Sequence, residues 1–156
     1  MPIQFKKPKP TLSEPEIDAA ENAIGVKFPR DYRSFLLRTN GGKPDPDGFD
    51  ILWGPDRPSL GWERSMVDWF LSIHDGEYSN IIEDNNISFK GRIPKDTLAI
   101  AYDPGDNLIL MGVGDDNNGK VYFWVRDHEV EEGDIPSYDN VGLLANSLPE
   151  FLDSLT

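Results

Sequence analysis

The sequence contains no cysteine among its 156 residues. Disulfide bonds, thiolate nucleophiles and thiolate metal sites are therefore excluded. A chain without cysteine also fits the reducing cytosol, so we expect a cytoplasmic protein.

Long apolar runs are missing as well. No run approaches the roughly 20 apolar residues that a membrane-spanning helix needs. The first residues, MPIQFKKPKPTLSEPE, lack the apolar core and the small-residue cleavage site of a signal peptide. We therefore expect a soluble, intracellular protein.

Basic residues are scarce: 15 Lys and Arg residues stand against 28 Asp and Glu residues, and the formal net charge is −13. This balance argues against direct binding to nucleic acid, where Lys and Arg contacts with phosphates supply most of the affinity. It also argues against adhesion to an anionic membrane. A basic protein partner would be attracted by the same charge. The alternative is that the acidic residues serve only solubility.

The apolar content is sufficient for one domain. Hydrophobic residues make up 38% of the chain and include four tryptophans, while 13 prolines and 14 glycines indicate many turns. A chain of this length buries a core without disulfides or metals. Because no internal repeat or linker divides it, we predict a short lead at residues 1–12 and a single domain at residues 13–156.

Two helices are predicted near the beginning of the chain. Ser13 and Glu16 form a capping box before the first helix, and Gly25 ends it. The stretch VKFPRDYRSFLLRTNGG, residues 26–42, predicts a second helix that starts at Pro29 and stops at Asn40, Gly41 and Gly42. The apolar residues that we expect on the buried sides are Ile17, Ala20 and Ile24 in the first helix and Tyr32, Phe35 and Leu36 in the second.

A sheet is predicted from alternating and apolar runs. Phe49, Ile51 and Trp53 alternate as in a half-buried strand. The runs LAIAYD (98–103) and LILMGVG (108–114) are separated by a tight turn, and DDNNG leads into the strand KVYFWVRD (120–127), both of whose faces we expect to be covered. Consecutive hairpins of this kind predict a twisted, mostly antiparallel sheet.

The remaining segments complete an α+β domain. Residues 59–76 show apolar side chains at near-helical spacing and predict a helix that Gly76 ends. Residues 77–95 have no clean period, so we expect irregular structure with short strands. Ser147 and Glu150 form a second S-x-x-E box, which predicts a final helix through Leu155. The fold class is therefore α+β, with helices flanking the sheet.

No catalytic motif is apparent. His74 and His128 stand without a G-x-S-x-G elbow, so surface or capping roles are favoured. The carboxyl pairs Glu83–Asp84 and Asp106–Asp127 could in principle act as acid and base, but the sequence does not give their separation. Solvated acids are the favoured interpretation.

Metal and phosphate motifs are incomplete. The run KPDPDGFDILWG resembles part of a calcium loop, but Lys43 and Gly54 occupy the positions of its first Asp and its bidentate Glu. The run GVGDDNNGK lacks the P-loop pattern and contains two acids that repel phosphate. We therefore predict no metal site and no cofactor.

Several motifs, in order along the chain, resemble the SMI1/KNR4 family of the SUKH superfamily. They are ENAIGVKFPRDYRSFLLRTNGG, the pair Trp53–Gly54, IPKDTLAIAYDPGDNLILMGVG, GKVYFWVRDHE and NSLPEFLDSL. The resemblance runs from about Ser13 to Leu155. It implies a compact α+β domain, and its matched residues are mostly fold-defining. Bacterial members of the family are typically immunity proteins that bind and neutralise a toxin, often a nuclease or deaminase, and fungal members act in cell-wall synthesis control.

We therefore expect a non-catalytic, cytoplasmic immunity protein that binds a cognate toxin. The alternatives are a regulatory or scaffold interaction module, as in the fungal relatives, and an enzyme that acts through paired carboxylates. Acids would pair with Lys and Arg of the partner, and aromatic residues would supply the desolvated contact. The candidate contact residues are Asp50, Trp53, Glu83, Asp84, Asp106 and Asp127. The sequence does not indicate the oligomeric state.

Overall fold

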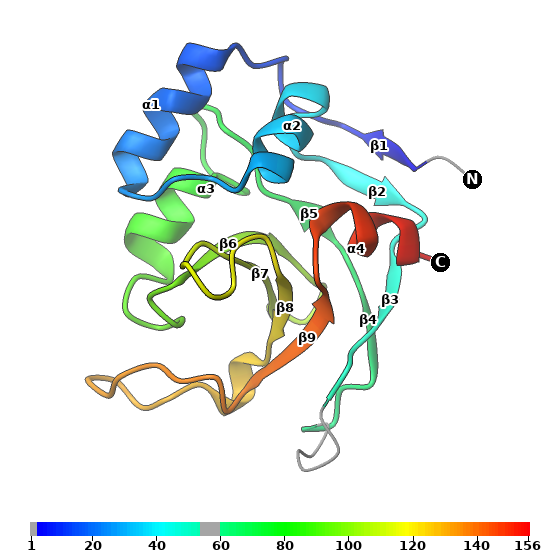
Figure 1. The fold of residues 1–156 in the computed structure, drawn as a ribbon. Coiled ribbons are helices and arrows are strands. Elements are labelled where there is room, and N and C mark those ends of the chain that lie inside the picture. Colours follow the sequence, from blue (N-terminus) through cyan, green and yellow to red (C-terminus); the bar gives the residue numbers. More distant parts are fainter. Residues whose placement is uncertain (1–2, 54–59) are drawn as a thin grey trace.

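The computed structural model describes residues 3–53 and 60–156 and shows helices packed against a curled antiparallel sheet (Figure 1). Five strands form the central sheet in the order β5–β6–β7–β8–β9. Their bounds are Trp69–Phe70, Thr97–Tyr102, Leu108–Gly112, Val121–Trp124 and Val141–Ala145. The predicted α+β class and the predicted hairpins over residues 98–114 are confirmed, because β6 and β7 pair antiparallel.

Two short strand pairs extend the central sheet at its two edges. β1 (Gln4–Lys6) pairs with β2 (Lys43–Asp45), and β3 (Gly48–Asp50) pairs with β4 (Arg64–Met66). Isolated bridges join Gly42 to Phe70 on β5 and Leu52 to Leu143 on β9. Of the three residues predicted to alternate in one strand, Phe49 lies in β3, and Ile51 and Trp53 follow that strand. The Ile51 side chain is buried and the Trp53 side chain is half-buried.

The predicted terminal helices are confirmed. α1 (Glu14–Ile24) has the complete Ser13–Glu16 capping box and ends at Gly25 in the left-handed conformation. α4 (Leu148–Ser154) is capped by the Ser147 hydroxyl, which accepts a hydrogen bond from the Glu150 amide at 3.2 Å. Each of these signals acts over three or four residues, so the local sequence is sufficient to specify them.

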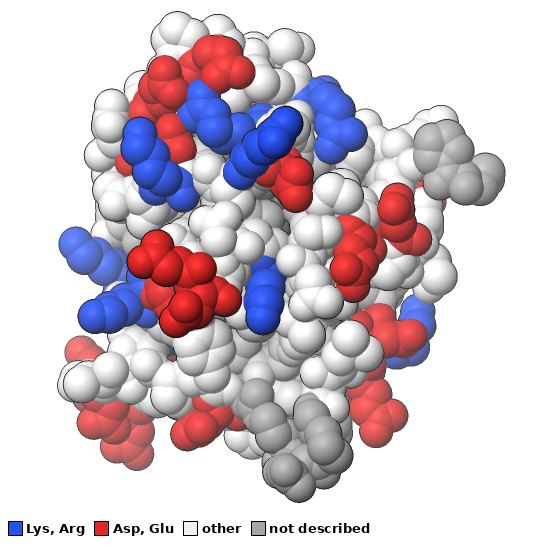
Figure 2. Space-filling view, in the orientation of Figure 1, with Lys and Arg blue, Asp and Glu red and all other residues white. Residues whose placement is uncertain are grey.

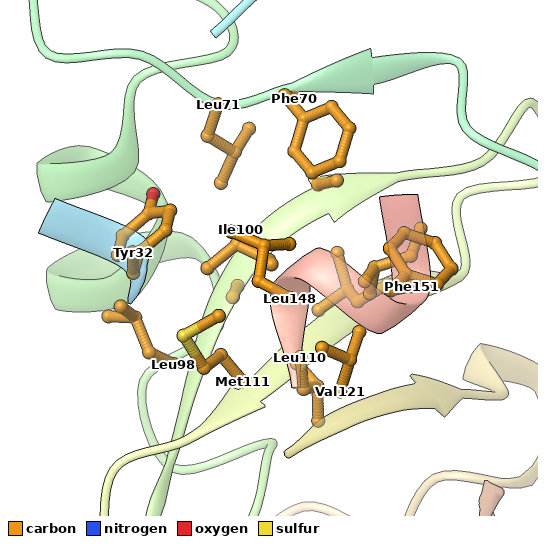
Figure 3. Close-up of a cluster of buried hydrophobic side chains, with 14 of the residues drawn as sticks. Tyr32, Phe70, Leu71, Leu98, Ile100, Leu110, Met111, Val121, Leu148 and Phe151 are labelled. Atoms are coloured by element: carbon orange, nitrogen blue, oxygen red, sulfur yellow. The ribbon is translucent and has the colours of Figure 1, made fainter. Parts of the chain in front are cut away.

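α2 (Arg30–Arg38) buries the predicted side chains Tyr32, Phe35 and Leu36. Figure 3 shows Tyr32 pointing toward side chains of the sheet and of α4 in one continuous core. The other side chains labelled there are Phe70, Leu71, Leu98, Ile100, Leu110, Met111, Val121, Leu148 and Phe151. β8 is covered on both faces as expected, because Phe123 and Trp124 are both fully buried.

The helix predicted over residues 59–76 is wrong. Its first residue lies outside the described residues, as does Gly54 of the Trp-Gly pair, and the rest of the segment forms β4 and β5. The Val67 amide donates to Asp47 O and the Leu71 amide donates to Ile100 O, at 2.9 and 2.8 Å. These bonds join the segment to β6 and to the residue that precedes β3, so tertiary pairing overrides the helical spacing. Met66, on the face expected to be buried, is 46% exposed.

The expectation for residues 77–95 holds only in part: residues 77–80 and 89–95 are irregular, with an isolated bridge at Asn80, but residues 81–88 are helical. α3 (Ile81–Glu83) continues into a π-helical turn, η1 (Asp84–Ser88), where short strands were expected. Asn80 caps α3, since its side chain accepts from the amides of Ile82 and Glu83. The segment is too short for a helical period to show in its apolar residues.

The two glycines after α2 act differently from the prediction. The helix already ends at Arg38, because Thr39 is extended. Gly41 (φ 71°) instead lies against β5, where an added Cβ would stand 2.7 Å from Phe70 O and 2.8 Å from Leu71 O. The Asn40 side chain completes this junction by bonding Pro10 O and both the amide and the carbonyl of Ile73. The Asn40–Gly42 junction thus joins the beginning of the chain, α2 and β5.

The first residues of the chain are part of this junction. β1 pairs with β2, and the Phe5 ring contacts the rings of Phe35 and Phe70 with centroids 5.5 and 5.9 Å apart. The division between a lead at residues 1–12 and a domain at residues 13–156 stays a prediction.

We predict that Gly41→Ala destabilises the fold by about 3 kcal/mol or more, since it adds a backbone overlap to the strain of a positive φ. Gly25→Ala is the matched control, because Gly25 also has a positive φ (87°) but its Cβ would meet nothing within 4 Å. We expect that control to lose only about 1 kcal/mol. Urea unfolding of both variants measures the difference, and equal losses would contradict the close approach to β5.

Candidate functional site

The structure separates the six predicted contact residues into two groups. Asp50 lies on β3, where its Oδ1 pairs with Arg64 Nη1 at 2.5 Å. Trp53 follows the same strand, half-buried, and its Nε1 donates to Trp62 O at 2.6 Å. The other four lie on elements around a single hollow.

We define the β6–β7 hollow by its lining residues, which come from four separate segments. It has a volume of about 320 Å³ and is lined by Tyr78, Ser79, Asp84, Phe89, Tyr102, Asp106, Leu108 and Arg126. Two of the predicted acids, Asp84 and Asp106, belong to it. Glu83 precedes Asp84 at the end of α3, and Asp127 follows Arg126 in the 3-10 turn η2 (Arg126–His128).

A buried carboxylate shapes the turn that carries Asp106. Asp103 is 1% exposed, and its Oδ1 accepts from the amides of Gly105 and Asn107 at 2.9 and 2.8 Å. Its Oδ2 accepts from Asn107 Nδ2 and from Ser65 Oγ, at 3.1 and 2.7 Å. Asn107 Oδ1 in turn accepts from the Arg126 amide at 2.9 Å. This network therefore sets the position of Asp106 and of the Arg126 backbone.

The loop before α3 contributes Tyr78 and Ser79 to the lining of the hollow, and its histidine, His74, has a structural role. His74 Nδ1 accepts from the Gly76 amide at 2.9 Å, and His74 Nε2 lies 3.0 Å from Tyr78 O. The Ser79 hydroxyl bonds the Tyr102 hydroxyl at 2.8 Å, which ties the loop to β6. His128, the other histidine, is exposed in η2.

Backbone strain is concentrated around the β6–β7 hollow. Tyr78, Ser79 and Asp106 all have positive φ, at 64°, 51° and 65°. Such a conformation is unusual for a bulky residue such as tyrosine. Tyr78 is also 83% exposed, so burial of its side chain does not offset the strain. Strained residues of this kind gather at functional sites.

Asp84 is held in an environment that disfavours its charge. Burial raises the pKa of the Asp84 carboxyl above its usual value, a hydrogen bond with the Ser88 side chain lowers it, and the Glu83 carboxylate raises it. Asp84 makes no ion pair with any described residue. Asp106 differs, because its Oδ2 lies 3.2 Å from Arg126 Nη1 in an exposed ion pair.

Acidic residues outside the β6–β7 hollow are unevenly distributed. In Figure 2 the Lys and Arg side chains lie in the upper and middle parts of the face shown, and the charged side chains of described residues in its lowest part are acidic. The loop between β8 and β9, at the lower left of Figure 1, contains six acids but only Arg126 as a basic residue in residues 126–139. The surplus charge thus lies partly beside Asp127 and the hollow.

Sequence reasoning missed Tyr78 and Arg126 as members of the site. The available signal for Tyr78 was a large aromatic residue inside the otherwise polar run HDGEYSN. For Arg126 no sequence signal was available, because its place beside Asp106 depends on the pairing of β7 with β8.

Other kinds of site find little support. Over residues 3–53 and 60–156, no group of three or more His, Asp or Glu side chains is arranged to hold a metal ion. Within the same ranges, none of the helices combines the length and the apolar character needed to cross a membrane.

Comparison with known proteins gives one result. The model of the SMI1 / KNR4 family (SUKH-1) matches residues 11–154. Curated proteins give no match.

We predict that Asp103→Asn destabilises the protein by about 2–3 kcal/mol, because the amide nitrogen cannot accept the two buried hydrogen bonds of Oδ2. Asp106→Asn, on the same turn, should change the free energy of unfolding by less than about 0.5 kcal/mol, since its ion pair is exposed and Asn tolerates a positive φ. Urea unfolding at pH 7 tests the pair. Similar losses in the two variants would contradict a structural role confined to Asp103.

We predict that Asp84→Asn stabilises the protein at pH 7. A carboxyl whose pKa is raised on folding opposes folding while it is charged, and this effect disappears as the pH falls toward the usual Asp value of about 3.9. The advantage of the variant should therefore shrink between pH 7 and pH 4. Urea unfolding across this range measures it, and a variant less stable than the parent at pH 7 would refute the raised pKa.

Proposed function

Because this chain belongs to the SMI1/KNR4 family (SUKH-1), we propose that it is a cytoplasmic immunity protein that neutralises a cognate protein toxin by stoichiometric binding. Domains of this family are generally non-catalytic immunity proteins. The match over residues 11–154 is the observation that carries the proposal, since it spans nearly the whole chain.

The contact surface that we propose is the β6–β7 hollow with its neighbours Glu83 and Asp127. The support is physical: a half-buried carboxylate at Asp84 that pairs with no Lys or Arg of the described residues, an exposed aromatic at Tyr78, and strained backbone at both Tyr78 and Asp106. Features that lower stability persist where function requires them. Asp50 and Trp53 form a second, separate candidate patch on the β3 side.

The acidic charge supports a basic partner. A net charge of −13 attracts a positively charged protein and raises its rate of association, and added salt weakens this effect. Toxins that act on nucleic acid, such as nucleases and deaminases, carry Lys and Arg around their substrate sites. Acids of the hollow would pair with these residues at or beside the substrate site, and Tyr78 would supply desolvated contact area.

A regulatory or scaffold module, as in cell-wall synthesis control, is the alternative within the same family. It uses the same kind of surface but would not rescue a cell from a toxin. The two functions are therefore separated by growth rescue, whereas binding alone does not separate them.

We predict that co-expression with the toxin from a neighbouring gene restores growth and that the two proteins purify as a 1:1 complex. The double variant Asp84→Asn/Asp106→Asn should weaken the complex roughly tenfold or more, because close charge pairs across interfaces are worth about 1.5–7 kcal/mol. Binding is measured by calorimetry and rescue by growth.

Asp115→Asn/Asp116→Asn is the matched control. It removes the same charge from exposed positions in the turn after β7, at the other end of that strand from Leu108. We expect it to bind as the parent does. Failure to rescue growth together with absence of a complex would refute the proposal. Equal losses of toxin affinity in the two double variants would show that the contact does not lie at the hollow.

A further inference from the structure

We propose that the β6–β7 hollow receives one arginine side chain of the partner, and that Arg126 occupies the place of this guanidinium in the free protein. The inference rests on the proposed function only in that the partner is a protein. The chemistry of the hollow itself can be tested without that partner.

The lining of the hollow has the composition that recognises a guanidinium. Tyr78, Tyr102 and Phe89 contribute aromatic rings, and Asp84 and Asp106 contribute carboxylates. Arginine stacks on aromatic faces and pairs with carboxylates through a planar fork of donors. Phe89 already takes part in such a contact, because the guanidinium carbon of Arg92 lies 4.9 Å from its ring centroid.

The two carboxylates of the hollow, Asp84 and Asp106, differ in their ion pairs. Asp106 pairs with Arg126 across 3.2 Å, while Asp84 has no ion pair with a described residue. The hollow therefore keeps a net negative charge after Arg126 is counted. Its unpaired member is the half-buried Asp84, where a cation would be less screened by water than at the surface.

Arg126 is suited to yield its place to a second arginine. Its side chain is 46% exposed and that of Asp106 is 72% exposed, and ion pairs this exposed are weak. Its backbone is fixed separately, since the Arg126 amide donates to Asn107 Oδ1 at 2.9 Å. Only the side chain needs to move when a partner arginine enters, so the exchange leaves the turn and η2 unchanged.

Arginine is favoured over lysine on geometric grounds. A guanidinium is planar, weakly hydrated and able to contact a ring and two carboxylates together, whereas an ammonium is a compact, strongly hydrated charge.

N-acetyl-arginine methylamide is the probe, titrated into the full chain and followed by amide chemical shifts, with N-acetyl-lysine methylamide as its matched control. We expect saturable shifts at residues 78–84, 102–108 and 126 with the arginine probe, with a dissociation constant on the order of millimolar for a single side chain. The lysine probe should bind at least threefold more weakly. Equal binding of the two probes, or shifts spread over the whole surface, would overturn the inference.

Three variants test the assignment of residues. Asp84→Asn should weaken binding of the arginine probe at least threefold, and Asp115→Asn should leave it unchanged. Arg126→Gln should strengthen binding severalfold because it frees Asp106; weaker binding in this variant would overturn the role of Arg126. If the arginine probe does not bind but the toxin is still neutralised, this inference is refuted and the proposed function stands. If the probe binds and no toxin is neutralised, the proposed function is lost and the arginine site stands.

Discussion

The fold depends on the close approach of the chain after α2 to the edge strand β5. At this junction the Asn40 side chain bonds Pro10 near the beginning of the chain and Ile73 after β5, and Gly42 exchanges two backbone hydrogen bonds with Phe70. Only a residue without a Cβ fits at Gly41. Because β5 pairs with β6 and runs on toward Tyr78, this contact also determines where one wall of the β6–β7 hollow stands.

Two aspartates on the turn between β6 and β7 differ in burial and in hydrogen bonding. Asp103 is buried and accepts four hydrogen bonds, so its charge is balanced by donors of the fold. Asp106, three residues later, is exposed at a positive φ, and its carboxylate pairs with the half-exposed side chain of Arg126. Asp103 therefore stabilises the turn beside the hollow, and Asp106 lies exposed on that turn. Tyr78 also combines a positive φ with an exposed side chain, and burial raises the pKa of the Asp84 carboxyl.

The excess of acids has a related distribution. Over α1 and α2, Arg33 pairs with Glu14, Asp18 and the buried Glu21. Residues 14–38 contain five acids and four basic residues, so the charge of this part of the chain is nearly balanced. Along residues 127–139 the acids outnumber their basic partners, of which Arg92 binds Glu129 through two nitrogen atoms. A basic protein would therefore meet its strongest attraction beside η2 and the β6–β7 hollow.

The sequence alone determined the elements whose signals are local. The capping boxes at Ser13 and Ser147, the turns at PGDN and DDNNG, and the helix after Pro29 act within a few residues, and the family resemblance follows from their order. Tertiary structure decided the rest. The short strands β4 and β5 lie within residues 60–76, whose amides bond partners such as Asp47 and Ile100, about 20 to 30 positions away. The hollow likewise joins residues 78 to 126, so Asp84 and Asp106 line one hollow only because β6, β7 and β8 are paired.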